Sequence, residues 1–142
     1  MTRVEFFFNV GNKPQKLAEL SEKAIGKGRR LLVYCRDAES AAELERVFWT
    51  NSALSFLPHC RATSPLASVT PIILDWEGKE MVHDDVLVNL QDAHPPFFSR
   101  FGRLIEIVGL DEKDKADARA RYRFYRDRGY EIRTFDANGA AL

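Results

Sequence analysis

The segment 119–133 holds the strongest concentration of side chains that could bind a charged ligand. It contains six arginines and two acidic residues, an excess of four positive charges, in a chain whose 21 basic and 21 acidic residues cancel. In a helix, steps of three and four residues return to the same side, so one stripe would carry Arg119, Tyr122, Arg123 and Arg126.

This stripe has a chemistry that suits more than one ligand. Guanidinium groups bind carboxylates through paired hydrogen bonds, and tyrosine rings offer apolar walls. The stripe therefore suits an acidic peptide with an apolar or carboxylate end, and it also suits phosphates with stacked bases. The alternative is a solvated helix face from which Tyr122 and Tyr125 pack inward.

Cys35 is the one candidate nucleophile. It lies with Arg36 and Asp37 where a predicted strand gives way to a predicted helix, a location that can lower the pKa of a thiol. The alternative is a cysteine buried at the end of the sheet, and no histidine or aspartate can be placed beside it from the sequence. The second cysteine, Cys60, has no CxxC spacing to the first, so we expect two reduced thiols and no disulfide.

Other site chemistries are not indicated. The histidines and cysteines lack metal-ligand spacing, and the turn after the first predicted strand has one glycine, Gly11, in place of a phosphate-binding glycine motif. The carboxylate groups at 84–85 and 111–114 are typical of caps and turns. We therefore predict no metal, no cofactor and no active site.

Large apolar side chains continue beyond a predicted helix into a proline-containing connection that should lie on the surface. Either this group is a docking surface for a partner, or Trp49 and Phe56 fold back over the edge of the sheet. Its members are Phe48, Trp49, Phe56, Leu57, Pro58 and His59.

The elements that must position these residues alternate between strand and helix. Apolar runs predict strands at 3–9, 30–35, 71–76, 86–90, 103–108 and 130–135, and helical spacing predicts helices at 13–27, 37–49 and 111–128, with a short helix from Pro95. Residues 51–71 are predicted to be a long irregular connection, and 136–142 a frayed tail. Such alternation favours right-handed crossovers and an α/β fold, a single Rossmann-like domain over 1–142 with a mainly parallel sheet and helices on both faces.

Composition fits this prediction. The chain has 142 residues, of which 45% are hydrophobic and 30% charged, as is usual for one globular domain. A net charge of zero argues against a protein that coats nucleic acid with its whole surface. No apolar run approaches the roughly 20 residues that cross a bilayer, and the first residues do not form a signal peptide, so we expect a cytoplasmic protein with no membrane contact.

Four motifs together resemble one known family. In order they are LERVFW at 44–49, SFLPH at 55–59, PIILDW at 71–76, and RARYRFYR at 119–126 followed by Gly129 and Tyr130. Their order and spacing are similar to those of the chi subunit of bacterial DNA polymerase III holoenzyme, an accessory protein of the clamp loader. The similarity covers essentially the whole chain, and it implies a Rossmann-like domain without nucleotide chemistry.

The resemblance implies a non-catalytic adaptor with two protein partners and only indirect contact with DNA. One partner is the psi subunit of the clamp loader, with contacts that carry over to Trp49 and Phe56 and neighbours at Phe48, Leu57, Pro58 and His59. The other is the acidic C-terminal tail of single-stranded DNA-binding protein, which ends in phenylalanine. Its site carries over to Arg119, Tyr122 and Arg123, with Lys115, Val108 and Arg126 nearby.

Within that tail site, the resemblance gives each side chain an expected role. Arg119 would bind the terminal carboxylate, while Val108 and the Tyr122 ring receive the phenylalanine. The remaining cations, Lys115, Arg123 and Arg126, would attract the acidic residues of the tail.

Overall fold

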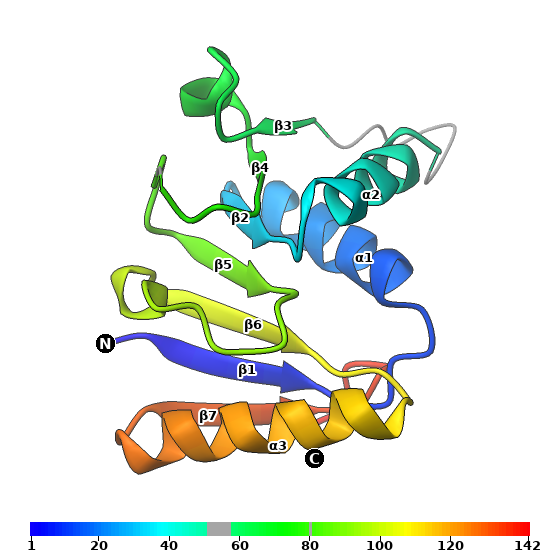
Figure 1. Cartoon of the computed structure of the whole chain (residues 1–142), viewed down its shortest axis with the longest axis vertical. Coiled ribbons are helices and arrows are strands. Elements are labelled where there is room, and N and C mark those ends of the chain that lie inside the picture. Colours follow the sequence, from blue (N-terminus) through cyan, green and yellow to red (C-terminus); the bar gives the residue numbers. More distant parts are fainter. Residues whose placement is uncertain (51–57, 80) are drawn as a thin grey trace.

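A parallel β-sheet forms the centre of the protein. The computed structural model describes residues 1–50, 58–79 and 81–142. Within them, the sheet has seven strands in the order β3-β4-β2-β5-β6-β1-β7, and every pair of neighbours is parallel (Figure 1). The strands are β1 (Arg3–Phe7), β2 (Leu31–Tyr34), β3 (His59–Arg61), β4 (Ile72–Asp75), β5 (Val86–Asn89), β6 (Arg103–Ile107) and β7 (Glu131–Phe135).

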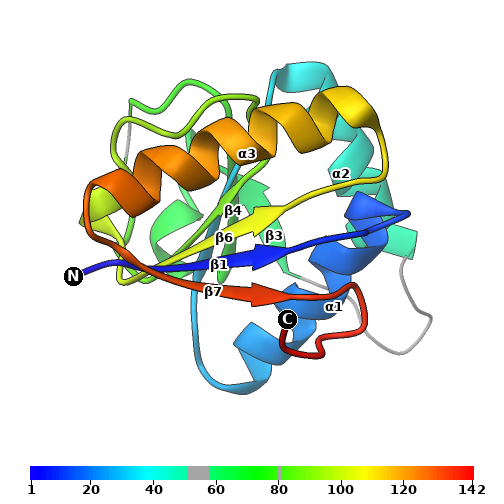
Figure 2. The same cartoon turned by 90° about the horizontal axis from the view of Figure 1, so that it is seen from below.

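Helices cover both faces of this sheet. Helices α1 (Lys13–Gly26) and α2 (Ala38–Thr50) pack on one face, and α3 (Glu112–Asp127) packs on the other with the short 3-10 helices η1 (Ala67–Val69) and η2 (Phe98–Arg100). Figure 2 shows α3 and α1 on opposite sides of β1 and β7. The prediction of an α/β fold with three layers is therefore confirmed. Among the described residues, no helix is both long and apolar enough to span a membrane.

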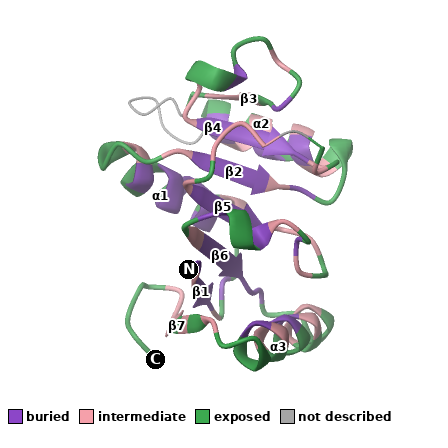
Figure 3. Ribbon diagram, turned by 90° about the vertical axis from the view of Figure 1, so that its left-hand side faces the viewer, coloured by how far each residue is buried: buried purple, intermediate pink, exposed green. Residues whose placement is uncertain are grey.

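Alternating side chains of the strands divide the core in two. The central strands are buried (Figure 3). They present Phe7, Val33 and Ile105 to α1 and α2, and they present Phe6 and Leu104 to α3. Because successive side chains of a strand point to opposite faces, a central strand with both faces covered needs apolar residues at nearly every position. This explains why the predicted strands were continuous apolar runs.

Side-chain caps set where the helices begin. The Asn12 side chain accepts a hydrogen bond from the Gln15 amide at 3.0 Å, and Asp37 accepts one from the Ser40 amide at 2.8 Å. Asp111 caps α3 in the same way. Each cap satisfies an amide that has no partner inside its helix.

Two segments differ from the sequence-based predictions. The connection 51–71, expected to be irregular, contains the edge strand β3 and the helix η1. A strand of three residues, none of them buried, carries too little pattern to be recognised without its partner strand β4. The tail 136–142, expected to be frayed, folds back against β7. The Asp136 amide donates to the Ala140 carbonyl at 2.8 Å, Lys16 Nζ donates to the Ala137 carbonyl at 2.9 Å, and Ala141 forms an antiparallel bridge with Phe135.

Candidate functional site

A crevice opens where β1 and β6 end side by side. The chain leaves β1 towards α1 on one face of the sheet and leaves β6 towards α3 on the other face (Figure 2). In open parallel sheets, neighbouring strands whose connections diverge in this way leave a crevice at their carboxyl ends, and ligands bind there. Phe8 and Asn9 follow β1, Val108 and Gly109 follow β6, and all four line hollows beside α3.

A buried polar network fixes how α3 sits over this crevice. Glu106 on β6 is completely buried and accepts hydrogen bonds from Arg121 Nε at 3.0 Å, Tyr125 Oη at 2.6 Å and Asn89 Nδ2 at 3.0 Å. Arg121 Nη1 also donates to the Asp92 carbonyl at 2.7 Å. Burial raises the pKa of Glu106, and the Arg121 charge and the three hydrogen bonds offset part of that rise. Because Arg121 and Tyr125 must face inward, the rotation of α3 about its axis is fixed.

The first hollow lies between α3 and the end of β1. It has a volume of about 310 Å³ and is lined by Phe8, Ala118, Arg119, Tyr122 and Arg123. Its two rings are held from beneath, since Phe6 stacks with Phe8 at 5.6 Å between centroids and packs against Tyr122 at 5.5 Å. The hollow therefore combines fixed aromatic walls with two guanidinium groups at its rim.

The second hollow adjoins the first. It has a volume of about 240 Å³ and is lined by Phe8, Asn9, Val108, Gly109, Lys115 and Arg119. Gly109 lies close to α3, because its amide donates to Asp114 Oδ2 at 2.6 Å and a Cβ atom there would come within 3.1 Å of the same oxygen. Asp114 is also paired with Lys13 at 2.7 Å, so this carboxylate is neutralised beside the hollow.

The cations around the hollows differ in how far they are already paired. In the described part of the chain the Arg119 guanidinium has no hydrogen-bond or ion-pair partner, and Arg123 Nε makes only a 3.4 Å hydrogen bond to the Arg119 carbonyl. Lys115 lies 3.8 Å from Glu112, a loose pair at the surface. Positive charge without a counter-ion above apolar walls suits a ligand that is both anionic and apolar.

The structure brings five of the six residues expected in this site to the two hollows. Arg126 lies outside both, paired with Asp127 at 3.2 Å. Val108 and Tyr122, which were expected to receive one ring together, line different hollows. Sequence reasoning missed Phe8, which lines both; its signal was the two-residue spacing from Phe6, which places both rings on the α3 side of the sheet.

A second surface lies at the end of α2. Trp49 is 64% exposed, and the His59 ring lies edge-on to it with centroids 5.8 Å apart; Pro58 is also exposed. Phe48 was expected at this surface, and that prediction is wrong: the side chain is fully buried, because it continues the inner stripe of α2 that packs on the sheet. Phe56 and Leu57 lie outside the described residues.

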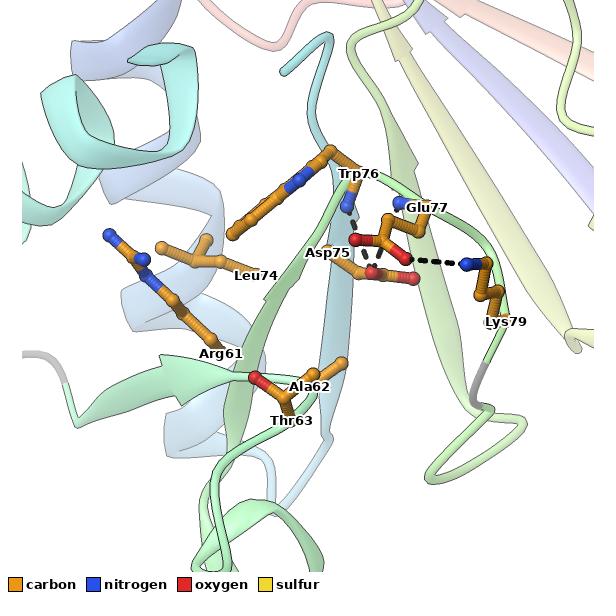
Figure 4. Close-up of a pocket in the computed structure, with 8 residues that line it drawn as sticks. All are labelled: Arg61, Ala62, Thr63, Leu74, Asp75, Trp76, Glu77 and Lys79. Atoms are coloured by element: carbon orange, nitrogen blue, oxygen red, sulfur yellow. Dashed lines mark hydrogen bonds and ion pairs between the residues drawn. The ribbon is translucent and has the colours of Figure 1, made fainter. Parts of the chain in front are cut away.

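A small hollow lies at the carboxyl ends of β3 and β4 (Figure 4). Arg61 lies over the Trp76 ring, with Cζ 5.3 Å from the centroid, and pairs with Glu45 of α2 at 3.0 Å. The Asp75 carboxylate accepts from three successive backbone amides at 2.9, 3.2 and 3.0 Å. The charged groups that line this hollow of about 160 Å³ are therefore already bound: Asp75 by backbone amides, Arg61 by Glu45 and Lys79 by Glu77.

Cys35 does not have the environment of a nucleophile. Its side chain is completely buried, its Sγ donates to the Val33 carbonyl at 3.7 Å, and burial together with the Asp75 charge raises its pKa to about 12. A reactive cysteine needs a lowered pKa and access to solvent. The hypothesis of a Cys35-dependent enzyme is therefore wrong. Among the described residues, no three His, Cys, Asp or Glu side chains gather closely enough to hold a metal ion.

Comparison with known proteins gives one consistent family. Residues 1–133 match the family described as DNA polymerase III chi subunit, HolC. The chain is 31% identical to the DNA polymerase III subunit chi of Pseudomonas aeruginosa over 93% of this chain and 94% of that protein. It is 32% identical to that of Haemophilus influenzae over 75% of each chain, and 28% identical to that of Escherichia coli over 84% of this chain and 82% of that protein.

The fold is also shared with a protein of unrelated sequence. The C-terminal domain of the DEAD-box protein Dbp5 superposes with a TM-score of 0.59 at 11% identity, over 97% of this chain and 91% of that one. At this identity the likeness concerns the fold alone.

Proposed function

Because the chain belongs to the DNA polymerase III chi subunit family, and is thus an accessory subunit of DNA replication, we propose that it is a non-catalytic adaptor between the clamp loader and protein-coated single-stranded DNA. On this proposal it pairs with the psi subunit through the surface around Trp49. It holds the acidic C-terminal tail of single-stranded DNA-binding protein in the hollows beside α3. Contact with DNA is indirect, and the protein works in the cytoplasm.

The observation that carries the proposal is the Arg119 guanidinium, which lines both hollows and has no counter-ion among the described residues. A peptide end offers the matching groups, a terminal carboxylate beside an apolar side chain. Exposed ion pairs contribute only about 0.2 to 1 kcal/mol each, and a short tail offers few anchors, so we expect a dissociation constant of roughly micromolar order that rises with salt.

The aromatic residues of α3 favour this ligand over single-stranded nucleic acid. Stacking with unpaired bases needs ring faces open to solvent. The Tyr125 ring is buried, and the Phe124 ring lies between His94, 3.5 Å from centroid to centroid, and Arg128, 3.6 Å from Cζ to centroid. Tyr122 packs on Phe6, so the helix offers few free faces for bases.

Trp49 supports the proposed pairing with psi. A tryptophan with 64% of its surface exposed at the end of a helix leaves apolar area in water, and tryptophan is enriched among the residues that contribute most to binding at protein interfaces. Its backbone is anchored by Phe48, which is buried in the core one position earlier. The side chain is therefore presented to a partner from a rigid element.

The test is a fluorescence anisotropy titration of a labelled acidic peptide that ends in Asp-Ile-Pro-Phe, at low and at physiological salt. We expect saturable binding by the wild type, weaker at higher salt, and its loss in Arg119→Ala. Arg100→Ala is the matched control, since Arg100 is an exposed arginine on η2 that lines neither hollow. Absence of wild-type binding, or equal loss in both variants, would contradict the proposal.

Two further arms separate the alternatives. Amidation of the peptide C-terminus removes the carboxylate, and Arg119→Ala removes the guanidinium that would bind it. Because either change removes the same ion pair, the amidated peptide should bind the wild type no better than the free-acid peptide binds Arg119→Ala. A labelled oligothymidine should show little affinity at physiological salt. Binding of the oligonucleotide that Arg119→Ala abolishes would favour a direct nucleic-acid module in place of the adaptor.

A further inference from the structure

A basic hollow lies at the amino ends of the strands, at the opposite end of β1 and β6 from the tail site. Because neighbouring strands are parallel, these ends share one edge of the sheet, where the chain enters β1, β5, β6 and β7 (Figure 1). The hollow has a volume of about 540 Å³, larger than either hollow beside α3. Two carboxylates and five cations line it, and the cations are Arg3, Lys23, Lys27, Arg29 and Arg103.

A buried carboxylate holds two of these arginines in place. Glu5 on β1 has a side chain that is 5% exposed; its Oε1 accepts from Arg103 Nε at 2.9 Å, and its Oε2 lies 3.1 Å from Arg3 Nε. The side chains of Arg3 and Arg103 are themselves 42% and 31% exposed, so both guanidinium groups remain accessible from the hollow. One carboxylate neutralises only one of the two guanidinium charges, and the other is left for a ligand.

Two lysines of α1 add charge that no other group neutralises. In the part of the chain that the structure describes, the ammonium groups of Lys23 and Lys27 have no hydrogen-bond or ion-pair partner. The end of α1 does not need them as caps, because the Ala24 carbonyl accepts from the Lys27 amide at 3.1 Å and the Ile25 carbonyl accepts from the Gly28 amide at 2.9 Å. Both lysine charges are therefore available to a ligand.

The two carboxylates in the lining are already engaged. Glu131 pairs with Arg133 at 3.2 Å, and Asp85 lies 3.6 Å from Arg29. With Arg133 and the buried Glu5 included, six basic residues meet three carboxylates. This leaves an excess of three positive charges at one end of the sheet, in a chain whose net charge is zero.

The apolar part of the lining gives a ligand little to bind. Leu20, Ala24, Val86 and Ile105 are at most 8% exposed, so only Met1 among the apolar lining residues presents its side chain to solvent. No aromatic side chain is among the described residues that line the hollow, so a base would find no ring on which to stack. The ligand must therefore be recognised by negative charge concentrated in a small volume.

We propose that this hollow binds a compact polyphosphate, the chain of phosphate groups that inorganic tripolyphosphate and nucleoside triphosphates share. Guanidinium groups donate paired hydrogen bonds to phosphate oxygens, and ammonium groups attract them as point charges. A polyphosphate concentrates several negative charges within the hollow, whereas a nucleic acid strand spreads its charges along an extended backbone. The inference goes beyond the proposed function and does not depend on it.

The experiment is a calorimetric titration of the full chain with tripolyphosphate, in magnesium-free buffer at constant ionic strength. The variant Lys23→Gln with Lys27→Gln removes the two unpaired lysine charges and should bind about tenfold more weakly than the wild type. The matched control is Lys79→Gln with Lys113→Gln, which changes the net charge equally at exposed lysines outside the hollow and should bind as the wild type does.

A second variant tests the arginines that the buried carboxylate holds. Arg3→Gln removes one guanidinium but leaves Glu5 its ion pair with Arg103, so the fold should be retained. We expect this variant to bind tripolyphosphate about tenfold more weakly, because hydrogen bonds between charged groups are lost. Thermal unfolding of each variant without ligand checks that the fold is intact.

Two further arms locate the site and identify the source of the ligand. Arg119→Ala should leave the affinity for tripolyphosphate unchanged, because Arg119 lies at the other end of β1 and does not line this hollow. Loss of binding in that variant would place the anion in the tail site and overturn the inference. ATP separates the sources, and either result supports the site: equal binding assigns nucleotides, and binding of tripolyphosphate alone assigns inorganic polyphosphate.

Other results would also overturn the inference. These are absence of saturable binding by the wild type, equal weakening in the two double-lysine variants, and sulfate that binds as tightly as tripolyphosphate. A duplex oligonucleotide that binds more tightly than tripolyphosphate, and that the Lys23 and Lys27 substitutions weaken, would assign the surface to nucleic acid instead. None of these results bears on the adaptor, which is tested by peptide binding that depends on Arg119.

Discussion

Removal of Arg121 should cost the protein more free energy than any other single change of a charged residue on α3. Arg121 is 4% exposed and Glu106 is completely buried, and their side chains meet at 3.0 Å. Arg121→Met keeps the length of the side chain but leaves the Glu106 carboxylate in the core without a counter-charge. Loss of one partner from a buried ion pair costs about 3 to 5 kcal/mol, so we expect the free energy of unfolding to fall by that amount at pH 8.

The dependence of this loss on pH has a definite sign. Burial already raises the pKa of Glu106 above its ordinary value of 4.5, and Arg121 is the largest of the influences that lower it again. Without Arg121 the pKa rises further, so between 4.5 and the raised value the folded variant binds more protons than the unfolded chain. The free energy of unfolding of Arg121→Met should therefore increase as the pH falls through this window, by at most about 1.4 kcal/mol per pH unit.

Urea unfolding between pH 5 and pH 8 measures both effects. The control is the double variant Glu106→Gln with Arg121→Met, which lacks the titrating carboxyl and should be more stable than Arg121→Met at pH 8. The reasoning would be refuted if the free energies of unfolding of the single and double variants changed in parallel with pH. It would also be refuted if Arg121→Met lowered the free energy of unfolding by less than about 1 kcal/mol at pH 8.

Three further outcomes are expected. In native protein Cys35 should resist a thiol reagent at pH 8, because burial holds its pKa near 12, and Cys35→Ala should keep both binding activities in the peptide and psi assays. Trp49→Ala should abolish co-purification with psi and leave peptide affinity unchanged, whereas Arg119→Ala should abolish peptide binding and leave co-purification with psi unchanged. The melting temperature of both variants should stay within error of the wild type. Loss of both contacts in either variant would contradict two separate surfaces. Gly78→Ala should destabilise the protein by about 2 kcal/mol in thermal unfolding, because φ at Gly78 is +71° and a Cβ there would lie 2.9 Å from a ring carbon of Phe97. Gly26→Ala is the control: Gly26 lies at the end of α1 with open space around it, so this change should be neutral or stabilising.

Several features of the protein could be predicted from local pattern. The continuous apolar run before Cys35 predicted a strand, and the predicted helix ranges 37–49 and 111–128 begin at the residues that cap α2 and α3. These predictions succeeded because a cap or a buried central strand depends on residues close together in the chain. The edge strand β3 and the folded-back tail were missed because their partners lie in other segments.

The arginine helix shows what the sequence could not decide. Spacing placed Arg119, Tyr122 and Arg123 on one stripe. It gave no way to know that Arg121 is neutralised in the core, while Arg119, at the surface, has no partner in the part of the chain that the structure describes. That distinction depends on Glu106, a residue of β6 that reaches Arg121 only after α3 has packed on the sheet.

The sequence by itself determined the α/β class, the family and the order of the strands and helices apart from β3 and η1, because periodicity, caps and motif spacing are written along the chain. Only the tertiary structure decided that Phe48 is buried while Trp49 is exposed, that the Cys35 thiol is buried, and that Phe8 joins α3 in one site. Burial and charge pairing are properties of neighbours in space, and the crevice exists only where β1 and β6 lie side by side with their connections on opposite faces.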